Sequence, residues 1–305
     1  MFTTDLKTIL QSFVKEVLFK DKELPRGGTE IWAPFDSLPD ETKVKIEGMK
    51  FMVRWLAGLK DMVQPLASTL RLLTLVIERR GDISMNQHTA PFENSWLRLS
   101  AAKCMLKLCQ EATYVASMTL TQFQNLAFVI HDPCLEVRDR FAQKLNKGLS
   151  TLKLPLEFLA IFALAGLDER KEFRAEVKRY LTNNITKRRE YVKDHVLSND
   201  DLLAYLPDYS LPYAIHLLAH LPFFTTYNDV PSLLKIKDCL SLLMEPLISK
   251  NENYSFSFFK RLLENIKQTK DKQAPDDSDA NLKLYAVCDL ALSLIISKKN
   301  ISLKD

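Results

Sequence analysis

The stretch HDPCLEVRDRFAQKLNKGL, residues 131–149, is the part of the sequence that decides the fold class. After an Asp-Pro pair, apolar side chains recur at every fourth position, at Val137, Phe141, Leu145 and Leu149. Because a helix turns once in 3.6 residues, this spacing puts the four side chains on one helix face. The stretch therefore predicts a turn at Asp132 followed by an amphipathic helix.

This pattern recurs along the chain. A shift of 36 residues moves Asp132 onto Asp168 and Val137-Arg138 onto Phe173-Arg174, and it moves the apolar segment 120–130 onto 156–166. A shift of 40 residues in the other direction brings Leu97-Arg98 under Val137-Arg138. Two helices in a period of 36 to 40 residues are typical of a helical repeat, whose units bury their apolar faces against each other. We expect an all-α fold, a HEAT-type α-solenoid of stacked antiparallel helix pairs.

The rest of the sequence also favours helices. It contains only 7 glycines in 305 residues and no Asn-Gly or Asp-Gly pair, so signals for tight hairpins are scarce. Further helices are predicted at 43–59, 68–77, 96–110, 211–221, 230–244, 255–269 and 282–296. We expect one domain over 1–305, with loops around 21–40 and 79–94 and a polar connection at 270–279 before the last helix.

Composition excludes several classes of protein. The net charge of +4 is too small to indicate nucleic-acid binding by itself, and no apolar run of membrane-spanning length is evident. The first twenty residues do not resemble a secretory signal, which indicates an intracellular protein. The cysteines are odd in number and lack CxxC spacing, so reduced and mostly buried thiols are expected rather than disulfides or a zinc ribbon: Cys104, Cys109, Cys134, Cys239 and Cys288.

The polar residues of the repeat admit a structural interpretation. An aspartate at the turn of such a unit accepts hydrogen bonds from the backbone or from an arginine of a neighbouring repeat. We therefore interpret Asp132, Arg138, Asp168 and Arg174 as structural residues that recur along the array rather than as catalysts.

A basic surface is the main candidate for binding. Arg140, Lys144 and Lys147 are spaced by four and three, so they line one side of a helix. One repeat later the sequence adds Lys178, Arg179, Lys187, Arg188 and Arg189. Residues 134–194 hold 14 Lys and Arg against 9 Asp and Glu, a net charge of +5. An acidic peptide, an inositol polyphosphate or a DNA backbone would each suit such a surface, and a merely solvated helix face is the alternative.

Signals for catalysis or cofactors are weak. His216 and His220 form an i, i+4 pair in HLLAH, but a leucine stands where a zincin has its glutamate, and no third ligand is evident nearby. We interpret the pair as packing histidines and predict no metal. The sequence has no GxSxG, Walker or GxGxxG motif. We therefore expect no enzyme activity and no cofactor.

Several stretches together resemble one family. KVKIEGMKFMVRWLAGL at residues 43–59, LKLPLEFLAIFAL at 152–164, LPYAIHLLAH at 211–220 and KLYAVCDLAL at 283–292 are similar to the carboxy-terminal part of the HEAT array in the precocious-dissociation-of-sisters cohesion regulators. Members of that family are much longer than this chain. The resemblance therefore implies a piece of the array without its amino-terminal repeats.

The resemblance implies a non-enzymatic regulator in the nucleus, associated with chromatin. Such a protein is a scaffold that binds the cohesin complex through its kleisin subunit and acts on DNA indirectly, without a membrane partner. Contacts with the cohesin-releasing factor belong to the missing amino-terminal side. Two alternatives remain open from the residues themselves: an electrostatic DNA-binding protein, and a generic solenoid adaptor for other proteins.

Overall fold

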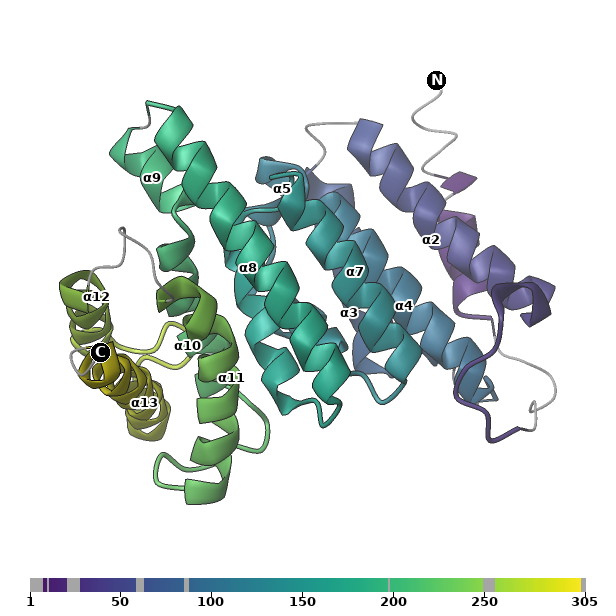
Figure 1. Cartoon of the computed structure of the whole chain (residues 1–305). Helices are drawn as coiled ribbons and strands as arrows, with labels where there is room; N and C mark the ends of the chain where they lie inside the picture. Colours follow the sequence, from purple (N-terminus) through teal and green to yellow (C-terminus); the bar gives the residue numbers. More distant parts are fainter. Residues whose placement is uncertain are drawn as a thin grey trace. The chain divides into compact units, whose positions relative to one another are not determined.

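The structure is a computed structural model, and it describes residues 8–9, 11–20, 28–58, 63–84, 88–196, 198–248 and 256–302. Over these residues it contains helices and turns and no strand (Figure 1). The predicted all-α class is confirmed, with helices packed on one another as in an α-solenoid. The chain forms two compact units, Met1–Gly148 (unit 1) and Leu149–Asp305 (unit 2). The expectation of one domain over 1–305 stays a prediction.

Unit 1 is a set of packed helices with α4 (Pro91–Leu108) at its centre. α4 packs on α2 and α3, and α3 also packs on α6. The other elements are η1 (Val14–Leu18, a π-helical segment), η2 (Phe35–Ser37, a 3₁₀ turn), α2 (Asp40–Gly58), α3 (Val63–Glu78), α5 (Ala112–Val115), α6 (Leu120–Phe128), η3 (Val129–His131, a 3₁₀ turn) and α7 (Leu135–Ser150, which ends in unit 2).

The start of α4 corrects the predicted loop 79–94, because residues 91–94 are helical. Pro91 occupies the first helical position, where a missing backbone N–H leaves no bond unmade. The Glu93 side chain accepts a hydrogen bond from the Ala90 backbone N at 3.4 Å and another from the Thr42 hydroxyl. Residues 85–87 of this loop, and 21–27 of the predicted loop 21–40, lie outside the described residues. α2 already begins at Asp40.

The helix predicted from the opening stretch is α7. Its four stripe residues, Val137, Phe141, Leu145 and Leu149, are fully buried, which confirms the predicted apolar face. The preceding helix α6 begins with reciprocal hydrogen bonds: Gln122 N donates to Thr119 Oγ1 at 3.2 Å, and Thr119 N donates to Gln122 Oε1 at 2.9 Å. The helix–turn–helix unit therefore has the order that the sequence pattern predicts.

Unit 2 is packed around η4 (Leu156–Leu167), which contacts α8, α10 and α11. Its other elements are α8 (Lys171–Asp194), α9 (Asn199–Tyr205), η5 (Pro207–Tyr209, a 3₁₀ turn), α10 (Ser210–Ala219), α11 (Val230–Ile248), α12 (Phe256–Lys267) and α13 (Ser278–Ser302). The polar connection predicted at 270–279 lies between α12 and α13, which begins at Ser278.

η4 differs from the helix that the 36-residue shift predicts. It aligns with the α-helix α6, yet its twelve residues form a 3₁₀ helix, and residues 158–166 are all buried. Its backbone approaches α11 closely, because a Cβ added at Gly166 would lie 2.6 Å from Cys239 Cα. A tighter helix that is apolar on every side fits a site enclosed by other helices.

One segment of the described chain, Ser278–Ser297 of α13, has the length and apolar composition of a membrane span. This corrects the sequence-based statement that no run reaches that length. Core helices of soluble proteins pass the same test, and 33% of this segment is buried inside the protein. α13 packs on α10, α11 and α12, and its buried residues include Ala280, Leu284, Val287, Cys288, Ala291 and Ile295.

Candidate functional site

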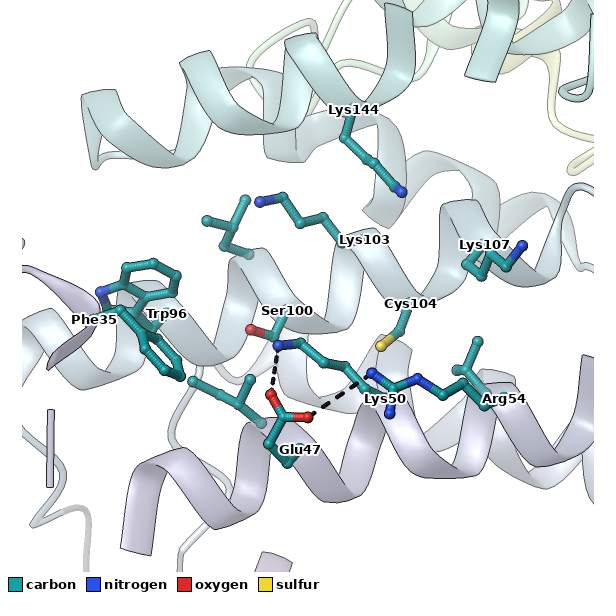
Figure 2. Close-up of a pocket in the computed structure, with 13 residues that line it drawn as sticks. Phe35, Glu47, Lys50, Arg54, Trp96, Ser100, Lys103, Cys104, Lys107 and Lys144 are labelled. Atoms are coloured by element: carbon teal, nitrogen blue, oxygen red, sulfur yellow. Dashed lines mark hydrogen bonds and ion pairs between the residues drawn. The ribbon is translucent and has the colours of Figure 1, made fainter. Parts of the chain in front are cut away.

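A cavity of about 580 Å³ lies in unit 1 (Figure 2). Three helices supply its cationic side chains: Lys50 and Arg54 come from α2, Lys103 and Lys107 from α4, and Lys144 from α7. Each pair on α2 and α4 is spaced by four residues, so both members lie on the same helix face. The floor is apolar, with Phe35, Ile46, Val53, Trp96 and Leu99.

The charges around this basic cavity do not balance. Its lining holds five Lys and Arg against one carboxylate, Glu47, which gives a net charge of +4. Glu47 forms ion pairs with Lys50 at 2.7 Å and with Arg54 at 4.0 Å, both on the α2 side. The one carboxylate of the lining thus pairs with the cations of α2. Lys103 and Lys107 of α4 and Lys144 of α7 have no carboxylate partner among the residues that line this cavity (Figure 2).

The lysines of the cavity shift one another's pKa. The pKa of Lys103 falls from 10.5 to about 8, chiefly because burial removes water from its ammonium group and then because Arg140, Lys144 and Lys50 repel a further positive charge. The pKa of Lys144 is lowered by burial and by Lys147 and Lys107. A bound anion would reduce this repulsion between the cations, so the electrostatics of the cavity favour an anionic ligand.

A second hollow of about 480 Å³ adjoins the first, and the two share Lys103 and Lys144. It also contains two residues of the predicted patch, Arg140 and Lys147. The Arg140 guanidinium lies over the indole rings of Trp32 and Trp96, with its carbon 5.0 and 5.3 Å from the ring centres. Glu136 and Asp139 make this second hollow less basic than the first.

The predicted patch residues of unit 2 behave differently. Lys178 and Arg179 are exposed and form ion pairs with Glu245 and Glu176 respectively. Lys187 is exposed and donates a hydrogen bond to the Ser150 carbonyl oxygen.

Arg188 and Arg189 require a correction, because they are buried and donate hydrogen bonds to backbone carbonyls. Arg188 donates to the Leu154 carbonyl at 2.9 Å, and burial lowers its pKa to about 10. Arg189 donates to the Leu247 carbonyl at 2.8 Å and pairs with Asp208 at 3.4 Å. Neither guanidinium is available at the surface for an anionic partner.

The turn residues of the repeats form hydrogen bonds of the structural kind. Asp132 is buried and accepts two bonds from Arg98, at 2.7 and 2.9 Å, and one from the Cys134 backbone N at 2.9 Å. Arg138 donates to the Asp132 carbonyl oxygen. The arginine that pairs with Asp132 is thus Arg98, which lies 34 positions earlier in the sequence and which the sequence pattern aligned but did not single out.

The second turn has a similar arrangement. Asp168 is buried and accepts a hydrogen bond from the Arg170 backbone N at 2.9 Å, and the Arg170 side chain pairs with its carboxylate at 3.1 Å. Arg174 donates to the Asp168 carbonyl oxygen at 2.7 Å, as Arg138 does at Asp132. These contacts support the structural interpretation of the four turn residues.

Sequence reasoning missed most of the basic cavity. Lys50, Arg54, Lys103 and Lys107 carry a readable signal, two i, i+4 cation pairs, but the pairs are about fifty residues apart in the sequence. It also missed a third residue beside the histidine pair: Asp271 lies with His216 and His220, so the statement that no third ligand is nearby was wrong. Burial and His220 lower the pKa of His216 to about 4.

Helices packed on one another without strands, over the described residues, define the class as an all-α protein of the α-solenoid type. The sequence comparisons narrow that class to one family. The family model described as sister chromatid cohesion protein PDS5 matches residues 1–304. The chain is 46% identical over 299 residues to the sister chromatid cohesion protein PDS5 homolog B of Mus musculus, and 45% identical to PDS5 homolog B of Homo sapiens.

These alignments cover 97% of this chain and 21% of those two relatives. PDS5 homolog A-A of Xenopus laevis is 45% identical over the same share of this chain and is covered over 23% of its length. The chain belongs to the sister chromatid cohesion protein PDS5 family, and the predicted family is confirmed. It spans about a fifth of the length of the curated relatives that it matches.

Proposed function

We propose that this chain acts in sister chromatid cohesion as a non-enzymatic scaffold, which binds the cohesin complex through its kleisin subunit in the nucleus, on chromatin. Family membership supports the process. The basic cavity of unit 1 is the observation that carries the binding role, because five cations converge there on an apolar floor. We propose that an acidic segment of the partner occupies this cavity.

The shape of the site favours a peptide over a DNA backbone. A peptide can place an apolar side chain on the floor near Trp96 and Leu99 while its carboxylates reach the surrounding lysines. A duplex instead contacts exposed cations along its phosphates and cannot enter a cavity of about 580 Å³. Lys103 and Lys144 are partly buried, which suits a narrow ligand.

The test is co-migration of the purified chain with cohesin's core subunits on size exclusion, in low and high salt, with duplex DNA as a parallel ligand. We expect cohesin to be retained at high salt, because salt screens a carboxylate paired with the partly buried Lys103 and Lys144 less than it screens exposed phosphate contacts. The variant Lys103→Gln/Lys144→Gln should lose retention. Lys178→Gln/Arg179→Gln, which removes two exposed cations of unit 2, should keep it.

Binding of DNA alone, and only at low salt, would contradict the scaffold proposal and favour the electrostatic alternative. Retention of cohesin by both variants would place the partner's contact outside the basic cavity. A thermal melt of each variant verifies that the helices are intact before binding is compared.

A further inference from the structure

Two histidines and an aspartate come together within unit 2. His216 lies on α10, His220 follows the end of α10, and Asp271 lies in the connection between α12 and α13. One ligand atom from each residue lies within 4.8 Å of the others. His220 Nε2 is 3.3 Å from Asp271 Oδ1, and His216 Nδ1 is 3.8 Å from Asp271 Oδ2.

The Asp271 carboxylate is fixed in place but incompletely satisfied. Its side chain has no exposed surface, and Oδ1 accepts hydrogen bonds from the backbone N of Gln273 at 2.8 Å and of Ala274 at 2.9 Å. Within the described structure, Oδ2 is buried and has no hydrogen-bond donor. A buried carboxylate oxygen without a donor is costly, so this oxygen requires a positive group near it.

The hydrogen bond of His220 also indicates that a positive group is needed beside Asp271. Its Nδ1 lies 2.9 Å from the His216 carbonyl oxygen, which can only accept, so Nδ1 carries the proton. In the neutral ring, Nε2 then presents a lone pair to Asp271 Oδ1 at 3.3 Å. Two acceptors at this distance need a proton or a metal ion between them. Metal-binding histidines usually donate their other ring N–H to a carbonyl or carboxylate, as His220 does here.

His216 completes the set. Its Nδ1 lies 3.8 Å from Asp271 Oδ2, the buried oxygen without a donor, and its ring centre lies 4.4 Å from that of His220. Ligands around one tetrahedral zinc ion, each about 2.1 Å from the metal, are roughly 3.4 Å apart. The distances from the histidine nitrogens to the two oxygens of Asp271, 3.3 Å to Oδ1 and 3.8 Å to Oδ2, are near that value, and one ligand atom from each residue lies within 4.8 Å of the others.

We propose that His216, His220 and Asp271 form a binding site for a divalent transition-metal ion, with Zn²⁺ as the ion that the donors fit best. Two imidazoles and a carboxylate suit zinc, whereas Mg²⁺ and Ca²⁺ prefer oxygen ligands alone. The histidine side chains are 19% and 17% exposed, so a fourth coordination position is open to water. Bound metal would tie α10 to the connection between α12 and α13.

The experiment uses the full chain after removal of metal with a chelator. Zn²⁺ titrated by calorimetry should bind at one ion per chain and raise the melting temperature with its concentration. Co²⁺ in its place should give visible ligand-field absorption bands. The single variants His216→Gln and His220→Gln should each weaken zinc binding by at least about 100-fold, since loss of even an outer contact costs 10- to 100-fold.

The matched control is His131→Gln/His195→Gln, which removes two exposed histidines outside the cluster and should bind zinc like the unmodified chain. The proposal is overturned if the unmodified chain shows no saturable zinc binding, or if both cluster variants bind as it does. An equal loss of melting temperature with and without zinc in His220→Gln, at unchanged zinc affinity, would identify a protonated His220 paired with Asp271 instead. Should a variant fail to fold, absence of the Co²⁺ bands in the unmodified chain also overturns it.

Discussion

The basic side chains of units 1 and 2 are arranged differently. In unit 1, five cations from three helices converge on one cavity that contains a single carboxylate. In unit 2, Lys178 and Arg179 pair with separate glutamates, and Arg188 and Arg189 are buried against backbone carbonyls. A candidate binding surface is therefore indicated by basic residues that line one cavity, and the number of basic residues in a stretch of sequence does not reveal it.

The largest expected effect concerns a buried arginine of unit 2. Arg189→Met should lower the free energy of unfolding by about 3–5 kcal/mol, because it leaves Asp208 buried without its cation. Asp208 already has a raised pKa caused by burial, which Arg189 partly offsets. Urea denaturation measures the change, with Lys193→Met, at an exposed site on the same helix, as the control. Equal stability of the two variants would contradict the structural role given to Arg189.

The next effect concerns the closed core of unit 2. Gly166→Ala should cost about 1–3 kcal/mol, because the new methyl group would meet the backbone of Cys239. Gly58→Ala, where a Cβ meets nothing within 4 Å, is the matched control and should change stability by less than about 1 kcal/mol. Thermal unfolding compares the two. A Gly166→Ala variant as stable as the Gly58→Ala variant would show that η4 does not need its close approach to α11.

Substitutions in the basic cavity of unit 1 should change its affinity for an anionic ligand more than the stability of the fold. Replacing Lys103 or Lys144 by glutamine should weaken binding of an acidic peptide by about 10- to 100-fold for each lysine, because a hydrogen bond to a charged group contributes about 1.5–3 kcal/mol. Stability should stay equal or increase for Lys103, whose burial as a cation is unfavourable. Fluorescence titration measures the affinity for the peptide, and urea denaturation measures the free energy of unfolding. A large loss of stability without loss of affinity would show that the lysines of unit 1 have a structural role and do not bind the peptide.

The smallest effect is a dependence on pH. The pKa of Lys103 is about 8 in the fold against 10.5 in the unfolded chain, so between these values the unfolded chain binds more protons. The unfavourable contribution of Lys103 to stability is thus present below pH 8 and disappears as the pH rises to 10.5. Stability therefore increases with pH, whereas the affinity for an anion should decrease. This affinity should fall at most about tenfold between pH 7 and 9, because Lys103 loses its proton. A Lys103→Met variant should lack this part of the pH profile.

The sequence predicted the local features of the fold well. The stripe at Val137 and Phe141 and the turn at Asp132 depend on neighbouring residues, and a helical period reports them directly. The start of α4 was misplaced because Pro91 resembles a loop residue until its helix is known. The 3₁₀ form of η4 depends on the helices that enclose it, which no local pattern contains.

The candidate sites were less predictable for the same reason. Lys50 and Lys103 meet through packing of α2 on α4, and Asp271 joins His216 across 55 positions. Charge spacing within one helix identified Arg140, Lys144 and Lys147 but gave Arg188 and Arg189 the same weight, although burial makes their roles different. Sequence shows which side chains share a helix face, whereas only tertiary packing shows which faces meet.

The most direct test of the account is calorimetric titration of the purified chain with an inositol polyphosphate, used as a compact multivalent anion. We predict one binding site per chain that is lost in Lys103→Gln/Lys144→Gln and kept in Lys178→Gln/Arg179→Gln, since only the first pair lines the basic cavity. Equal binding by both variants, or loss in the second alone, would contradict the claim that the converging cations of unit 1 form the binding site.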